Sequence, residues 1–365
     1  DARDVIRNTN TTISGINFSN KFSVLRSPQW TCAREADLKI GFDSQSGCII
    51  SSIESINHKA CLALVRHNSN KTGGALRPVL FFHGATVPTL MTSAYRIDGL
   101  SWFDALAANE RPIYGLDLLG YGESDPYPDE EDGLPKNPSD FGPGPSLIGE
   151  IDAVVDRIRS ENNVDSIHII AISRGAIPAG YYSTAHPEKV RSLTLHGPIT
   201  RQSGLGSAVI QKYFGTPSLP AISHFSVSAQ DRFVLLRDDR PSGTISPLEE
   251  GFVRNWANDY SQRVHGDRNQ VDKPIKAPMG FAVDISSAWN DDYFDETLLT
   301  MPTFIIRGEW DEVLTPAASC QALFEKIPGS RKRYLQLPEA THSMMYEKCR
   351  HDVHRYTKLF LADHD

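Results

Sequence analysis

The serine at position 173 stands where an apolar run gives way to a helical pattern. Residues 166–172 read SIHIIAI, and small residues then resume at helical spacing in RGAIPAG. The pattern A-I-S-R-G matches Gly-x-Ser-x-Gly with Ala171 in place of the first glycine, and alanine is still small enough for a strand and a helix to approach closely. Such a turn presents the hydroxyl at the positive end of a helix. Ser173 is therefore a candidate nucleophile, and an ordinary helix N-cap is the alternative.

An aspartate and a histidine follow two later apolar runs. Asp311 comes after FIIRG at 304–308, and His342 comes after RKRYLQL at 331–337. Because the carboxyl ends of parallel strands meet at one edge of a sheet, we expect both side chains near Ser173. A serine hydroxyl needs a base to take its proton, and the histidine needs a carboxylate to fix its tautomer. The chain order Ser, Asp, His is the one that accompanies this kind of nucleophile turn.

The motif HGA at 83–85 completes the predicted chemistry. It follows the apolar run VLFF, and its turn would offer the Ala85 N–H to an oxyanion, beside the N–H of Arg174. Arg174 acts in this interpretation through its main chain, and its side chain is free to pair with a carboxylate nearby. His83 is expected to hold the loop by hydrogen bonds, with a place in the substrate pocket as its alternative role.

The elements around these residues alternate in type. Three runs of alternating polarity within 38–68 predict a meander of antiparallel strands. From residue 77 onward, continuous apolar runs of strand length alternate with helical patterns, which predicts right-handed crossovers and a mostly parallel sheet. The expected fold is a doubly wound α/β domain that begins with antiparallel strands.

One stretch interrupts this alternation. Residues 199–298 are rich in Phe and Trp but poor in strand patterns, and an excursion of this length is expected to be a subdomain rather than a loop. We expect an inserted, mostly helical cap over the carboxyl edge of the sheet. The core is then 35–198 together with 299–365, preceded by an N-terminal arm at 1–34.

Four further side chains are candidates for the substrate pocket: His196, Trp256, Trp289 and Tyr293. His196 ends a predicted strand and could reach the pocket floor. The three aromatic residues lie in the insertion, and they either line an acyl pocket or form the core of the cap. If they line the pocket, they favour an apolar or aromatic acyl group.

These motifs together resemble the α/β-hydrolase superfamily, in a serine-dependent, esterase- and lipase-like branch with a cap. The resemblance spans about residues 79–360, interrupted by the cap. It rests on HGA at 83–85, GLDLLGYGESD at 115–125, AISRGAIPAG at 171–180, RGEWDEVLTP at 307–316 and ATHSM at 340–344. The resemblance implies Ser173 as nucleophile, His342 as base and Asp311 as its carboxylate, with the two oxyanion donors already named.

The same resemblance implies no metal and no organic cofactor. Asp117 and Ser124 match the family's structural turn after a strand. The sequence HDVH at 351–354 places two histidines one helical turn apart, but no third ligand has suitable spacing, so we interpret it as a solvated helix face.

The composition excludes several other classes of protein. The chain has 365 residues, of which 40% are hydrophobic and 22% charged, as in a folded globular protein. A net charge of −8 argues against nucleic acid as a partner. No apolar run approaches the roughly 18 residues of a membrane span. We expect a small-molecule ester or related acyl substrate, and the sequence leaves the oligomeric state open.

Three glycosylation sequons, at Asn10, Asn17 and Asn70, suggest a secreted glycoprotein. The chain begins without methionine, which is typical of a mature chain after signal removal or of a shortened one. A cytoplasmic protein is the alternative.

The five cysteines show no metal-ligand spacing. For a secreted protein we expect a Cys320–Cys349 disulfide and one pair among Cys32, Cys48 and Cys61, which leaves one thiol over. Buried free thiols are the alternative.

The predicted function is hydrolysis of a carboxylic ester through an acyl-enzyme intermediate. Hydrolysis of a carbon–carbon bond or a lactone, or acyl transfer to an alcohol, would use the same three side chains and remains open. A non-catalytic binding protein with a hydrolase-like fold is the alternative of a different class.

Overall fold

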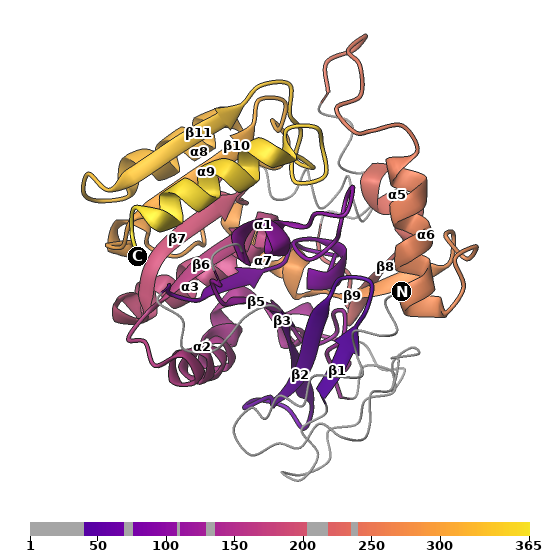
Figure 1. The fold of residues 1–365 in the computed structure, drawn as a ribbon, viewed down its shortest axis with the longest axis horizontal. Coiled ribbons are helices and arrows are strands. Elements are labelled where there is room, and N and C mark those ends of the chain that lie inside the picture. The colour runs from indigo at the N-terminus through magenta and orange to yellow at the C-terminus, as the bar shows by residue number, and fades with distance from the viewer. Residues whose placement is uncertain (1–39, 69–75, 108–109, 129–135, 203–217, 235–239) are drawn as a thin grey trace.

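The structure is a computed structural model that describes residues 40–68, 76–107, 110–128, 136–202, 218–234 and 240–365 (Figure 1). The predicted N-terminal arm and the three sequon asparagines, Asn10, Asn17 and Asn70, lie outside the described residues. The arm and the glycosylation therefore stay predictions.

The largest sheet in the described part of the chain has nine strands, in the order β1-β2-β3-β5-β4-β6-β7-β10-β11. These strands are β1 (Ile40–Asp43), β2 (Cys48–Glu54), β3 (Cys61–His67), β4 (Val79–Phe82), β5 (Ile113–Asp117), β6 (Ile167–Ile172), β7 (Val190–His196), β10 (Thr303–Gly308) and β11 (Lys332–Leu337).

The pairing of the strands confirms the predicted fold class. The strands β1, β2 and β3 are antiparallel neighbours, and β3 joins β5 in antiparallel register. From β5 to β11 every neighbouring pair is parallel. Parallel neighbours need crossovers, and helices provide them here, as the alternating sequence pattern predicted.

Helices lie between the strands and after the last of them in the described part of the chain. They are α1 (Trp102–Ala107), α2 (Ile148–Asn162), α3 (Ala176–Ala185), α5 (Ala229–Val234), α6 (Phe252–His265), α7 (Gly280–Ala288), α8 (Ala317–Lys326) and α9 (Arg350–Ala362). Short 3-10 turns accompany them, among them Ser173–Gly175 directly after β6.

Both faces of the sheet are covered. Buried residues of α2, α3 and α8 join one apolar cluster, and those of α1 and α9 join the other. Alternate residues of β6 enter the two clusters, with Ile167 and Ile169 on one side and Ile170 and Ile172 on the other. This two-residue period is what a strand buried on both faces requires.

The segment 199–298 lies between β7 and β10, and it differs from the prediction in one respect. It contains α5, α6 and α7, but also two strands that the sequence pattern did not indicate. These are β8 (His224–Ser228) and β9 (Pro274–Pro278), which pair in antiparallel fashion. Figure 1 shows them with α5 and α6 on the side of the molecule away from α2 and α3.

Buried residues of segment 199–298, called the insertion below, belong to the same two apolar clusters as residues of the sheet. Phe233 and Trp256 pack in the cluster that contains α1 and α9, while Met279 and Phe281 pack in the cluster that contains α2 and α3. The insertion is therefore anchored on both apolar layers of the domain.

The predicted Cys320–Cys349 disulfide is wrong, because Cys48, Cys320 and Cys349 are free thiols. Cys320 is buried in α8 and Cys349 precedes α9, so the two cysteines belong to elements on opposite faces of the sheet. With Cys48 free, Cys32 and Cys61 are the remaining candidates for a pair. Cys32 lies outside the described residues, and that disulfide stays a prediction.

Within the described ranges, no helix has the length and apolar character needed to cross a bilayer.

Candidate active site

Ser173 occupies the sharp turn between β6 and α3. Its φ of +54° is in the left-handed region, which a serine adopts only where the surrounding structure holds it there. The helix can approach the strand because residue 175 is glycine: a Cβ at Gly175 would lie 2.6 Å from the carbonyl oxygen of His83. Ala171 is fully buried in β6, between Phe82 and Leu195 of the neighbouring strands.

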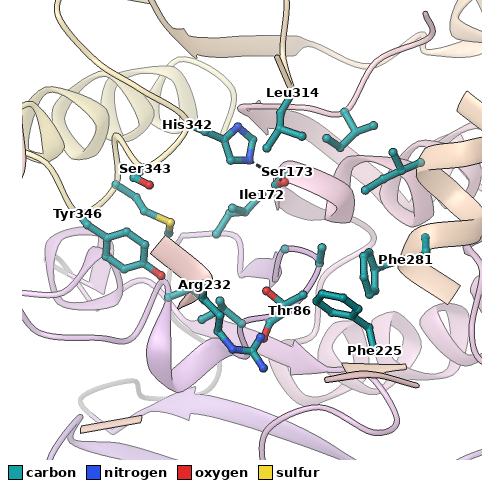
Figure 2. A pocket seen from close by; sticks show the side chains of 18 of the residues that line it. Thr86, Ile172, Ser173, Phe225, Arg232, Phe281, Leu314, His342, Ser343 and Tyr346 are labelled. Carbon is teal, nitrogen blue, oxygen red and sulfur yellow. Dashed lines mark hydrogen bonds between the residues drawn. The ribbon is translucent and has the colours of Figure 1, made fainter. Parts of the chain in front are cut away.

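His342 connects Ser173 to Asp311. Its Nε2 lies 2.8 Å from Ser173 Oγ, and its Nδ1 lies 2.7 Å from Asp311 Oδ2. The three side chains come from the ends of three strands, since Ser173 follows β6, Asp311 follows β10 and His342 follows β11. Figure 2 shows the His342 ring directed at Ser173. The structure thus brings together the three residues that the sequence singled out.

Asp311 is completely buried. One of its oxygens faces His342, and the other, Oδ1, has no hydrogen-bond partner in the described part of the chain. Thr315 Oγ1 lies 3.4 Å from His342 Nδ1, beside the carboxylate. An ionised Asp311 would therefore hold the Nδ1–H tautomer of His342, which leaves Nε2 as the acceptor toward Ser173.

A second carboxylate, which no sequence pattern indicated, supports the turn that carries His342. Glu347 is fully buried and accepts hydrogen bonds from the backbone N–H and the hydroxyl of Thr341, the residue before His342. Burial raises the pKa of Glu347 to about 7. No spacing in the sequence signals this contact, because it arises only when the turn after β11 folds back.

The HGA loop is held by buried side chains. Leu118 N–H donates to His83 Nε2 at 3.2 Å, which leaves the proton on Nδ1 to donate to Gly84 O at 2.8 Å. Burial lowers the pKa of His83 to about 4, so the ring is neutral. Tyr121 Oη donates to Ala85 O at 2.7 Å. His83 therefore holds the loop, in agreement with its predicted structural role.

The Arg174 side chain is buried and ion-paired. Its Nε donates to Asp284 Oδ2 at 2.6 Å, and its Nη2 donates to the carbonyl oxygen of Gly142. The other oxygen of Asp284 accepts the N–H of Gly144 at 2.6 Å. Asp284 belongs to α7, so this pair ties the residue after the candidate nucleophile to the insertion.

A cavity of about 160 Å³ opens at Ser173 and His342. Its walls are mostly apolar, and they come from the HGA loop, the strand ends and the insertion. The lining residues are Gly84, Ala85, Thr86, Val87, Thr92, Ile172, Ser173, Ile199, Phe225, Arg232, Phe281, Ala282, Ile285, Ser286, Trp289, Leu314, His342, Ser343, Met345 and Tyr346. Apart from His342, Arg232 is the only one of these side chains that is basic or acidic near neutral pH.

Of the predicted pocket residues, Trp289 lines this cavity, while His83, His196, Trp256 and Tyr293 do not. Trp256 packs among aromatic rings and donates its Nε1 to Met91 O at 3.0 Å. Tyr293 is buried and donates its hydroxyl to Ile199 O at 2.7 Å. These two residues therefore match the alternative interpretation, in which they belong to a core.

His196 lies behind the site rather than in its wall. Its ring packs against Trp102, with centroids 5.1 Å apart, and burial together with His342 lowers the pKa of His196 to about 3. His196 is thus neutral at the pH at which His342 would act as a base.

Asp117 and Ser124 form a buried turn. Asp117 Oδ1 accepts the N–H of Thr89 at 2.8 Å, and Asp117 Oδ2 accepts that of Glu123 at 3.1 Å. Ser124 Oγ donates to Asp117 O and accepts Ala63 N–H at 2.8 Å. Both residues therefore bind backbone, as their predicted structural role requires.

The interpretation of HDVH as a solvated helix face is wrong for His354. His351 is exposed, but His354 is buried in α9 and stacks on Trp102 of α1, with centroids 5.9 Å apart. The sequence could not show that α1 packs on this face of α9. Across the residues that the structure describes, no cluster of three or more His, Cys, Asp or Glu side chains could hold a metal ion.

The comparisons with known proteins agree with this fold. A family model described as alpha/beta hydrolase fold matches residues 77–222. No curated protein sequence matches the chain significantly.

Several solved structures resemble the chain over most of its length. A thermophilic esterase from Thermogutta terrifontis is 17% identical, with 87% of this chain and 99% of that chain covered and a TM-score of 0.52. A monoacylglycerol lipase from Paleococcus ferrophilus is 14% identical, with 83% and 99% covered and a TM-score of 0.54. Est816, an N-acyl homoserine lactone degrading enzyme, is 14% identical, with 85% and 99% covered and a TM-score of 0.56. The nine-stranded sheet, the family match over residues 77–222 and these likenesses agree that the chain has the α/β-hydrolase fold.

Proposed function

We propose that this protein is a serine hydrolase that cleaves a carboxylic ester through an acyl-enzyme. One observation carries the proposal: the chain of contacts from Asp311 through His342 to Ser173 ends at an apolar cavity. A buried core serine would need none of these neighbours. A helix N-cap would direct its hydroxyl at the backbone of its own helix, whereas Ser173 Oγ makes its hydrogen bond with His342 Nε2.

The reaction proceeds in two halves. His342 Nε2 takes the proton of Ser173 Oγ while the oxygen attacks the ester carbonyl, and the imidazolium then gives this proton to the departing alcohol. His342 then takes a proton from a water molecule that attacks the acyl-enzyme, and it returns this proton to Ser173 Oγ as the bond from Oγ to the acyl carbon breaks and the carboxylic acid leaves. Asp311 accepts the hydrogen bond from His342 Nδ1 and stabilises the imidazolium.

Negative charge develops on the carbonyl oxygen in both halves of the reaction. The backbone N–H groups of Ala85 and Arg174 are the proposed donors to this oxygen. His83 and His196 are both neutral, which favours His342 as the base, because a second cation next to His342 would oppose formation of its imidazolium.

The cavity walls favour an apolar acyl group. Phe281, Ile285 and Trp289 of the insertion line the cavity together with Ile172 at the end of β6. Burial of an apolar group contributes about 25 cal/mol per Å² of surface removed from water, so acyl chains that fill the cavity should bind better than acetyl. We propose medium-length aliphatic or aromatic acyl esters as substrates.

A burst-phase assay with p-nitrophenyl esters, from acetyl to long-chain and aromatic acyl groups, tests the proposal. We expect a stoichiometric burst in the wild type that Ser173→Ala abolishes, together with fluorophosphonate labelling of the wild type only. Lactones belong in the panel because Est816 degrades one, and the same acyl-enzyme would serve. Absence of both burst and labelling in the wild-type protein would favour a binding protein instead.

We also propose that the protein is secreted and glycosylated. The support is the three sequons in the sequence. The protein should be secreted from a eukaryotic host, and enzymatic deglycosylation should then lower the intact mass of the secreted protein. An unchanged mass would contradict the proposal.

A further inference from the structure

Arg232 is a buried arginine of α5 in the wall of the cavity. Only 3% of its surface is exposed. Its Nη1 donates to Thr86 O, and its Nη2 donates to Ile275 O of β9 at 3.0 Å. Figure 2 shows Arg232 beside Thr86, on the side of the cavity away from His342.

No carboxylate of the described residues pairs with Arg232, and its Nε has no hydrogen-bond partner among them. The nearest compensation is the ring of Tyr260, whose centroid lies 5.1 Å from the guanidinium carbon. Burial lowers the pKa of Arg232, but an arginine titrates so far above neutral pH that it keeps its charge. An unpaired buried cation is unfavourable for folding, so a purely structural role would be filled better by a neutral side chain.

The contacts of Arg232 complete a series along the HGA loop. Three successive carbonyl oxygens each accept a hydrogen bond from a buried side chain: Gly84 O from His83, Ala85 O from Tyr121, and Thr86 O from Arg232. Tyr260 of α6 also donates to Thr86 O, at 3.3 Å. Fixing three consecutive carbonyls fixes the planes of their peptides, including the Gly84–Ala85 peptide that carries the Ala85 N–H.

The donors to this series come from two parts of the chain. His83 and Tyr121 belong to the core, whereas Arg232 and Tyr260 belong to the insertion. The hydrogen bonds to Thr86 O therefore form only while α5 and α6 pack against the rest of the domain.

We propose that Arg232 is a positioning residue that holds the loop at residues 84–86 in place. The position of the Ala85 N–H, the proposed oxyanion donor, then depends on the packing of the insertion against the rest of the domain. This inference rests on the proposed serine hydrolase function. The fork of Arg232 holds two carbonyl oxygens, Thr86 O and Ile275 O, at once. Its charge, which no carboxylate of the described residues balances, would add a positive potential on the side of the loop that carries the oxyanion donor.

Three variants separate these contributions. Arg232→Met removes fork and charge, Arg232→Lys keeps the charge without the fork, and Tyr260→Phe removes the second donor to Thr86 O. The matched control is Arg263→Met. Arg263 also ties the insertion to the core, through Asp43 at 2.9 Å, but it does not line the cavity.

The readouts are kcat, KM and the affinity for a trifluoromethyl ketone, which forms a tetrahedral oxyanion on the serine. Active sites are counted by fluorophosphonate titration, so that unfolded protein does not enter the rates. Loss of one oxyanion donor lowers turnover about 10²–10³-fold, so a displaced donor in Arg232→Met should lower kcat by about 10–100-fold with KM little changed. Ketone affinity should fall by the same factor. Arg232→Lys should recover part of both losses, and Tyr260→Phe should show a smaller loss of the same kind.

The inference is overturned if Arg232→Met keeps wild-type kcat per titrated site, or if KM rises while kcat and ketone affinity stay unchanged. It is also overturned if Arg263→Met lowers kcat equally, because any loosening of the insertion would then suffice. If Arg232→Met yields no folded protein, Tyr260→Phe and Arg232→Lys decide by the same criteria. These outcomes can be distinguished from failure of the proposed hydrolase function, because the wild type itself would then show neither burst nor labelling.

Discussion

Arg174 and Asp284 form a buried ion pair between the turn that carries Ser173 and helix α7 of the insertion. The side chains are 1% and 2% exposed, and Arg174 Nε lies 2.6 Å from Asp284 Oδ2. Together with the contact from Arg232 to Thr86 O, this pair places one arginine link to the insertion beside each proposed oxyanion donor.

Breaking this pair from one side should destabilise the fold. Asp284→Ala leaves the Arg174 guanidinium buried without a counter-charge, which should lower the free energy of unfolding by about 3–5 kcal/mol. Urea denaturation measures the change. The control is Asp352→Ala, whose exposed pair with Arg355 should contribute less than about 1 kcal/mol. Equal effects of the two substitutions would contradict the role of burial.

Asp311→Asn should leave the shape of the site intact but slow the reaction. The asparagine amide can donate to His342 Nδ1, which places the imidazole proton on Nε2 and removes the base that faces Ser173. We expect kcat to fall about 10³–10⁴-fold with little change in melting temperature. A loss below tenfold would show that Asp311 does not control the tautomer.

Gly175→Ala should disturb the nucleophile turn. The new Cβ would lie 2.6 Å from His83 O and 3.0 Å from Phe82 O, and these backbone atoms cannot rotate away. Overpacking of this kind lowers stability by about 1–3 kcal/mol, and the shift of Ser173 should reduce kcat as well. Gly149→Ala in α2 is the matched control, because its Cβ would meet only the exposed side chain of Ile56. Calorimetry gives the stability of both variants, and kcat gives their activity. Equal losses in Gly175→Ala and Gly149→Ala would contradict the prediction.

Glu347 should make stability depend on pH. Burial raises its pKa in the folded protein from 4.5 to about 7, so its stabilising contribution is complete below pH 4.5 and is lost as the pH rises through about 7. Over this window the wild type should lose up to about 1.4 kcal/mol per pH unit relative to Glu347→Gln. Denaturant unfolding of both proteins across the window gives the difference. Parallel curves would show that the carboxyl ionises normally.

Three of the five cysteines should behave as thiols that are shielded from solvent. Burial raises the pKa values of Cys48, Cys320 and Cys349 to about 12, so native protein should react slowly with iodoacetamide. Unfolded, unreduced protein should take up three labels, and reduced protein five, if Cys32 and Cys61 are paired. Five labels before reduction would rule that disulfide out. Intact mass reads the count directly.

Much of the fold was predictable from the sequence because strands buried on two faces are continuous apolar runs. The run SIHIIAI became β6, and the turn at Ser173 followed from the small residues beside it. Asp311 and His342 could be placed because strand ends in a parallel sheet converge.

The remaining features depend on contacts between distant segments. The strands β8 and β9 are short and partly exposed, with prolines at Pro274 and Pro278, so no strand pattern marked them. Arg232 binds backbone oxygens, and Glu347 binds the N–H and the hydroxyl of Thr341. Residue types alone indicate neither contact. The Cys320–Cys349 prediction failed because sequence spacing does not show on which face of a sheet a cysteine lies.

The insertion leaves the sheet after β7 and returns at β10, and these two strands are direct neighbours. Leu193 is in register with Thr303 and His196 with Ile306, and Gly197 N–H donates to Ile306 O at 2.7 Å. The hydrogen bonds between β7 and β10 therefore hold the two ends of the insertion side by side. A different insertion could join the same two strands while Ser173, Asp311 and His342 keep their positions. In evolution, such a junction would let substrate preference diverge while the reaction chemistry is retained. Such an insertion would have to supply a new donor for the carbonyl oxygen of Thr86 and a new carboxylate for the buried side chain of Arg174.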